Sequence, residues 1–179
     1  MAEGCCVWFT GLPCAGKTTM AVQLAEWLEK KGVEAVLLDG DVLRRTVSAD
    51  LGFSRDQRQA NVERVAALAS EVVQRGGVAI CALVSPYRDA RKSAREIVGS
   101  ANFVEVFVDT PLEVCEGRDV KGMYRAARAG TLEHFTGVSD PYEAPLNPEV
   151  QVAGIGEMSV AIQPILDAME RRIVRQAKA

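Results

Sequence analysis

The sequence predicts an α/β fold in which a mostly parallel sheet lies between two layers of helices, a three-layer α/β/α sandwich. Short apolar runs alternate with amphipathic helical patterns along the whole chain. The runs are apolar nearly throughout rather than at every second residue, which is typical of strands in a parallel sheet that helices cover on both faces. Alternation of strand and helix then favours the sandwich over an antiparallel fold.

Five apolar runs predict the strands. They are residues 5–10, 34–39, 78–84, 103–109 and 149–153, the last being short. Periodic apolar positions between the runs predict helices; for example, Met20, Leu24, Trp27 and Leu28 share one helical face. The predicted helices are residues 17–31, 56–74, 87–99, 110–119 and 158–176.

Glycine and proline mark the ends of these elements. Gly32 and the pair Gly76–Gly77 follow helices, and Pro111 stands at a helix start. Residues 121–148 are different, because they are rich in Gly and Pro, carry Lys121, Arg125 and Arg128, and are too long for an ordinary connection. We predict that this span is an irregular lid or binding loop.

Composition excludes several classes of protein. The 179 residues fit one domain, and the net charge of -3 argues against a protein that coats nucleic acid. No apolar run approaches the ~20 residues of a membrane helix, and the N-terminus lacks the features of a signal peptide. Five cysteines without metal-ligand spacing are expected to be reduced thiols. We therefore expect a cytoplasmic protein whose partners are neither nucleic acids nor membranes.

A phosphate-binding loop follows the first predicted strand. Residues 11–18 match G-x-x-x-x-G-K-[ST], and an amphipathic helix comes directly after them. The glycines let backbone N–H groups surround phosphate oxygens, and the helix N-terminus adds its positive dipole end. We expect Lys17 to reach the β- and γ-phosphates of ATP and Thr18 to bind Mg²⁺. The predicted ATP-binding residues of this P-loop are Gly11, Leu12, Pro13, Cys14, Ala15, Gly16, Lys17, Thr18 and Thr19.

Two carboxylates end the second predicted strand. Asp39 and Asp41 stand in VLLDGD, at the edge of the sheet where ligands bind in doubly wound folds. A carboxylate there orients Mg²⁺ or takes the proton from an attacking hydroxyl; the alternative is an ordinary strand-ending turn. The length of the chain, a lid that carries Lys121, Arg125 and Arg128, and the absence of a guanine-reading NKxD motif favour a small kinase of the P-loop NTPase and nucleotide-kinase type.

The chain resembles the adenylylsulfate (APS) kinase family of P-loop small-molecule kinases. The stretches that carry the resemblance are TGLPCAGKTT, LDGDVLR, DLGFS, VSPYRDAR, VFVDTPLEVCEGRDVKGMYRAARAG and FTGVSDPYEAPLNP. The resemblance implies a single domain over residues 1–179 with a lid at about 121–148. It also implies a sulfate-activating phosphotransferase that moves the ATP γ-phosphate to the 3′-hydroxyl of adenosine 5′-phosphosulfate, giving PAPS and ADP. Mg²⁺ as cofactor, a homodimer, and fusion to or cooperation with ATP sulfurylase are further implications.

The resemblance also implies roles for individual residues. Lys17 and Asp39 would be catalytic. Asp39 would be the base near the acceptor hydroxyl while Asp41 binds APS; the alternatives are that these two roles are exchanged or that Asp39 acts mainly through Mg²⁺. Ser85 would be the third catalytic candidate, because it matches a serine treated in part of the family as a phosphorylated active-site residue. Direct transfer needs no such intermediate and favours a place for Ser85 in the APS pocket wall. Arg118 would cover the ATP adenine. The implied APS-binding residues are Asp41, Arg44, Phe53, Arg58, Asn61, Ser85, Lys121 and Phe135, with the two phenylalanines stacking on the adenine.

Some positions depart from the family pattern. Val42 stands where the family usually has a polar residue, and the P-loop has Pro13–Cys14 where the family usually has Ser-Gly. In the next helix, Gln57, Ala60 and Glu63 replace Asp, Glu and Arg. These departures leave two alternatives open: a kinase for another nucleotide-linked hydroxyl, and a non-catalytic nucleotide-binding regulatory domain associated with ATP sulfurylase. The intact catalytic residues favour an enzyme.

Overall fold

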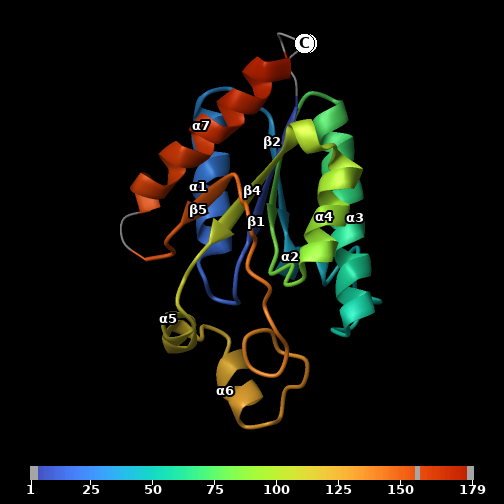
Figure 1. Ribbon diagram of the computed structural model, residues 1–179, viewed down its shortest axis with the longest axis vertical. Coiled ribbons are helices and arrows are strands. Elements are labelled where there is room, and N and C mark those ends of the chain that lie inside the picture. The colour runs from blue at the N-terminus through green and yellow to red at the C-terminus, as the bar shows by residue number, and fades with distance from the viewer. Residues whose placement is uncertain (1–3, 156–157, 177–179) are drawn as a thin grey trace.

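One parallel five-stranded sheet forms the centre of the molecule (Figure 1). The computed structural model describes residues 4–155 and 158–176. The strands are β1 Cys5–Thr10, β2 Ala35–Asp39, β3 Val78–Ala82, β4 Phe103–Val108 and β5 Val150–Val152. They lie in the order β2-β3-β1-β4-β5, and every pair is parallel. All five predicted strands and the predicted fold class are therefore confirmed.

Helices cover both faces of the sheet, as predicted. Figure 1 shows α1 Lys17–Lys30 and α7 Met158–Gln176 on one side, and α3 Arg55–Gln74 and α4 Arg88–Val98 on the other. The shorter elements are α2 Gly40–Leu43, the 3₁₀-helix η1 Ser100–Asn102, α5 Leu112–Arg118 and α6 Met123–Arg128.

Three short helices were not predicted, and one of them corrects the expected irregular lid. α6 lies within residues 121–148, because Asp119 accepts hydrogen bonds from the backbone N–H of Tyr124 and Arg125 at the start of the helix (2.9 and 3.1 Å). At the start of α2, Asp39 is the N-cap residue, and its side chain accepts from the backbone N–H of Asp41 and Val42. Six-residue and four-residue helices are too short to show helical periodicity in a sequence.

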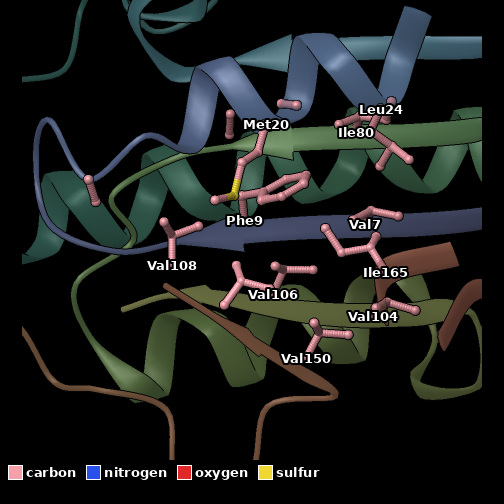
Figure 2. Packing of buried hydrophobic residues seen from close by; sticks show 14 of the residues in the cluster. Val7, Phe9, Met20, Leu24, Ile80, Val104, Val106, Val108, Val150 and Ile165 are labelled. Atoms are coloured by element: carbon pink, nitrogen blue, oxygen red, sulfur yellow. The ribbon is translucent and has the colours of Figure 1, made fainter. Parts of the chain in front are cut away.

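Alternate side chains of each strand fill two separate cores. Figure 2 shows the core under α1 and α7, in which Val7 and Phe9 of β1 meet Met20 of α1 and Ile165 of α7. Trp8 points to the opposite face, toward α3 and α4. Strands buried on both faces need apolar side chains at every position, which explains why the predicted runs did not alternate.

The carboxyl ends of β1 to β4 meet at one edge of the sheet, beside α5, α6 and the lid (Figure 1). β3 ends at Ala82, two residues before the end of the predicted run, so that residues 83–87 leave the sheet at this edge. Of the helices that the structure describes, none has the length and apolar character needed to cross a membrane.

Candidate active site

One cavity of about 780 Å³ at this edge of the sheet brings most of the predicted site residues together. The predicted residues that line it are Pro13, Cys14, Gly16, Lys17, Thr18, Thr19, Asp39, Asp41, Arg44, Phe53, Arg58, Asn61, Ser85, Arg118, Lys121 and Phe135. Gly11, Leu12 and Ala15 belong to the same P-loop but do not line the cavity. The sequence missed several lining residues, including His134, Thr136 and Gly154.

The P-loop runs from the end of β1 to the start of α1, as its motif predicts. A side chain at Gly11 would place its Cβ 2.6 Å from the Val108 carbonyl oxygen, so only glycine lets the loop pass β4. Gly16 caps α1 with a φ of 107°, a conformation that other residues rarely adopt. The buried Lys17 ammonium donates to the carbonyl oxygens of Gly11 (3.0 Å) and Leu12 (2.6 Å).

Burial lowers the pKa of Lys17 from its usual 10.5 to about 8. Phosphate groups bind the charged ammonium better than the neutral amine, so deprotonation of Lys17 weakens ATP binding. We expect ATP affinity to change little between neutral pH and about 8, and to fall above it toward a limiting slope of about tenfold per pH unit. Calorimetric titration with ATP across this range measures the effect. Lys17→Arg is the control, because its guanidinium stays charged and should flatten the profile; a flat wild-type profile contradicts the prediction.

Thr18 and Asp39 form a pair of oxygen donors beside the P-loop. The Thr18 hydroxyl donates to Asp39 Oδ2 (2.8 Å), while Asp39 Oδ1 accepts from the backbone N–H of Asp41 and Val42 (2.9 and 3.2 Å). Among the described residues, no group of three or more His, Cys, Asp or Glu side chains could hold a metal by itself. Mg²⁺ fits here nonetheless, because it usually takes one or two protein oxygens and completes its shell with substrate phosphates and water.

Two arginines, Arg44 and Arg58, pack against the ring of Phe53 in another part of the cavity wall. Arg44 lies with its guanidinium carbon 4.5 Å from the centre of the Phe53 ring, and Arg58 lies at 5.4 Å. Arg44 also donates to the carbonyl oxygen of Gly52 (2.6 Å), and Arg58 to that of Phe53 (2.9 Å). Burial is the main cause of a lowered pKa at both arginines. Both stay charged at neutral pH, because the ordinary pKa of a guanidinium lies far above neutrality.

Residues 133–136 of the lid line the same cavity as Arg44 and Arg58. Arg58 donates to the His134 carbonyl oxygen, which ties α3 to the lid. Phe135 is 5% exposed and meets the edge of Tyr124 at 4.9 Å between ring centres, whereas Phe53 is 47% exposed. Asn61 and Thr136 also line the cavity, and within the described residues Asn61 Oδ1 and Thr136 Oγ1 are buried without a hydrogen-bond partner.

Asp41 and Lys121 form an ion pair across the cavity. The pair joins α2 to the segment between α5 and α6, and both side chains are at least half exposed. Exposed pairs contribute little to stability. The contact is therefore easily exchanged for contacts with a charged ligand.

Ser85 lies in the cavity wall with a φ of 39°, an uncommon conformation for a residue with a side chain. Its hydroxyl accepts a hydrogen bond from the indole N–H of Trp8 (3.1 Å), and the residue is 3% exposed. A buried and hydrogen-bonded hydroxyl is poorly placed to receive a phosphoryl group. The geometry favours a role in the pocket wall over a phosphorylated intermediate.

The P-loop is held from outside by Thr110 and Tyr124, which the sequence did not identify, and by Arg118, which it assigned to the ATP adenine. Thr110 donates to the Ala15 carbonyl oxygen (2.8 Å), and Tyr124 donates to that of Pro13 (2.9 Å). Arg118 donates to Cys14 (3.1 Å) and Gly154 (2.5 Å), so it joins the P-loop to the end of β5. No local pattern could reveal these contacts, because the partners lie far apart in the chain.

The structure explains two of the departures from the family pattern. Gln57 completes a capping box with Ser54 at the start of α3. Glu63 accepts hydrogen bonds from Gln59 (2.6 Å) and from Ser93 of α4 (3.1 Å), so the reversed charge serves the contact between the two helices. Val42 is 58% exposed and does not line the cavity. Nothing in the structure explains Ala60.

Comparison with known proteins identifies close relatives. A family model described as adenylylsulphate kinase matches residues 3–153. The adenylyl-sulfate kinase of Paraburkholderia xenovorans is 52% identical over 151 residues, which are 84% of each chain. The Mycobacterium tuberculosis APS kinase CysC, solved with AMPPNP and APS, has a TM-score of 0.91 at 40% identity and covers 95% of this chain and 99% of its own. A hexameric APS kinase from Thiobacillus denitrificans has a TM-score of 0.71 at 35% identity, covering 95% of this chain and 29% of its own.

Proposed function

The chain belongs to the adenylylsulphate kinase family, and we propose that it transfers the γ-phosphate of ATP to the 3′-hydroxyl of APS, giving PAPS and ADP. One observation carries the proposal. A single cavity joins the P-loop to Phe53, its two arginines and Phe135. A P-loop alone serves many acceptors, but an aromatic and cationic cluster in the same cavity fits an acceptor with a purine base and an anionic phosphosulfate.

Donor residues act mainly by position and charge. When the phosphates of ATP enter the P-loop, the Lys17 ammonium exchanges the carbonyl oxygens of Gly11 and Leu12 for phosphate oxygens. Thr18 and Asp39 are the residues that would hold Mg²⁺, which neutralises charge on the β- and γ-phosphates when bound with ATP. Arg118 already touches the P-loop and is assigned to the ATP adenine.

Acceptor residues hold the base and the anion of APS. Phe53 and Phe135 stack on the adenine, and Arg44 and Arg58 bind the phosphosulfate, for which a planar and permanently charged guanidinium is suited. Asn61 offers its buried, unpartnered oxygen to the same ligand. Asp41 binds APS, and Lys121 neutralises phosphate during transfer, once their mutual ion pair opens. Asp39 is also placed to take the proton of the 3′-hydroxyl.

Asp39→Asn is expected to lower kcat by about a hundredfold and to raise the Mg²⁺ concentration needed for half-maximal rate. The amide keeps the cap of α2, because asparagine caps helices as well as aspartate does, but it removes the negative charge. Steady-state rates across a Mg²⁺ titration measure both effects. Asp56→Asn, an acidic residue in the first turn of α3, is the control. A full rate for Asp39→Asn would contradict both roles of this carboxylate.

The primary test is ATP turnover with Mg²⁺, with and without APS, with the product identified by mass. PAPS formed only in the presence of APS is the expected result. Turnover with another nucleotide-linked hydroxyl and none with APS would overturn the assignment of the acceptor. Nucleotide binding without any turnover would overturn the enzyme itself and favour the regulatory alternative.

We extend the proposal to a homodimer, which the family resemblance implies. Light scattering on the purified chain measures its mass directly, and a monomer or a hexamer would contradict the dimer. A cytoplasmic location is in line with the buried thiols of Cys6, Cys81 and Cys115. Association with ATP sulfurylase is tested by mixing the two proteins on a sizing column.

A further inference from the structure

Three arginines of α4 fasten the last residues of the lid and the residue that follows them. Arg88, Arg91 and Arg95 recur at helical spacing on α4, and each donates to residues 143–149. Arg88 binds the Ala144 carbonyl oxygen (2.8 Å), Arg91 binds that of Glu143 (2.6 Å), and Arg95 binds the Glu149 carboxylate (2.8 Å). Only one of the three also reaches the wall of the cavity.

That residue is Arg91. Its guanidinium is almost completely buried and donates in three directions. Nε binds the carboxylate of Glu105 in β4 (2.8 Å), Nη2 binds the Glu143 carbonyl oxygen, and Nη1 binds the Ser85 carbonyl oxygen (2.7 Å). A planar guanidinium is suited to hold three partners in fixed directions, whereas an ammonium lacks that geometry.

The Ser85 end of this network belongs to the cavity wall. Ser85 and Pro86 line the cavity, and the strained backbone of Ser85 persists only if its surroundings hold it. Trp8 holds the hydroxyl of Ser85, and Arg91 holds its carbonyl. Pro86 in turn accepts a hydrogen bond from the backbone N–H of Glu143 (2.8 Å).

The Glu143 end of the network belongs to the lid. Residues 135–140 form a compact turn, in which the Phe135 carbonyl oxygen accepts from the N–H of Val138, Ser139 and Asp140. Tyr142 lies two residues after this turn. Its hydroxyl forms a hydrogen bond with the Thr10 hydroxyl (2.9 Å), and its ring centre lies 5.7 Å from the guanidinium carbon of Arg91. The Arg91 side chain therefore holds both Ser85 and the segment directly after the turn that carries Phe135.

We propose that Arg91 is a positioning residue for binding of the acceptor. Arg91 fixes the cavity wall at Ser85 and the turn that carries Phe135 relative to each other, and it does not touch the substrate. This inference rests on the proposed function. Loss of Arg91 should weaken the binding of APS and leave the binding of ATP unchanged, because Arg91 contacts no residue of the P-loop.

Arg91→Lys is the test, with Arg95→Lys as its matched control. Both residues lie on the same helix and pair with Glu105, so either variant leaves that carboxylate one arginine. We expect Arg91→Lys to raise the KM for APS by about tenfold or more while the KM for ATP stays unchanged, because small displacements of a substrate-positioning group have large effects. Arg95→Lys should lower Tm to a similar extent without changing either KM.

Equal rises of the KM for APS in both variants would overturn the proposal, because they would report general loosening of α4. An unchanged KM in Arg91→Lys would overturn it as well. If Arg91→Lys does not fold, Trp8→Phe releases Ser85 from the other side, and the same selective rise in the KM for APS is expected.

A spectroscopic readout separates this inference from the proposed function. The chain has two tryptophans, and only Trp8 donates its indole N–H to Ser85. In Arg91→Lys, the Trp8 indole ¹H–¹⁵N signal should shift while that of Trp27 does not. An unshifted Trp8 signal overturns the inference alone, whereas wild-type protein that makes no PAPS overturns the proposed function alone.

Discussion

Lys17→Ala is expected to lower kcat by about a thousandfold, the size of effect seen when one group that stabilises transition-state charge is removed. Phosphoryl transfer depends almost entirely on position and charge stabilisation. Lys17 supplies a buried ammonium at the P-loop, where little water screens it. APS-dependent formation of PAPS, measured under single-turnover conditions, reports the loss.

Two further variants exclude trivial causes for that loss. Lys17→Met keeps most of the apolar stem and removes a buried charge, so lost turnover should come with a Tm no lower than that of the wild type. Lys30→Ala removes an exposed lysine from the end of the same helix and should leave turnover unchanged. A Lys17→Ala enzyme with wild-type turnover would refute the mechanism.

Phe135→Ala is expected to raise the KM for APS by about 5- to 150-fold, because stacking on a base is worth about 1–3 kcal/mol. The KM for ATP should change little. The variant should also lower Tm on the order of 10 °C, since Phe135 is buried against Tyr124 and the loss of a core phenylalanine costs about 3–5 kcal/mol. Steady-state kinetics and a thermal melt measure the two effects.

Phe53→Ala separates recognition from stability, because Phe53 is 47% exposed. We expect the same selective rise in the KM for APS with a much smaller change in Tm. Equal losses of affinity for ATP and APS in either variant would contradict the stacking role.

Local patterns were enough to predict most of the fold. The strands are apolar at every position because helices cover both faces of the sheet, and the P-loop motif follows from the glycines that its backbone requires. The exceptions were α2, η1 and α6, which are too short to show a period. Asp39 caps α2, and Asp119 accepts hydrogen bonds from the first turn of α6.

The acceptor side of the cavity was predicted through the resemblance rather than from residue chemistry alone. Arg44, Phe53 and Arg58 lie within fifteen residues of one another, so the family motifs that contain them can be recognised in the sequence. Phe135 and Lys121 come from the lid, and only the lid motif placed them in the same site. The structure brings all five to one cavity.

The sequence by itself determined the order of strands and helices, the phosphate-binding loop and the family, because each of these is encoded in residues a few positions apart. Only the tertiary structure decided what holds the site in shape. Thr110 and Tyr124 support P-loop residues 95 and 111 positions away, and Arg91 reaches Glu143 across 52. Such contacts arise from the strand order and from the packing of α4 and the lid, and a buried polar group takes whichever partner the fold places beside it.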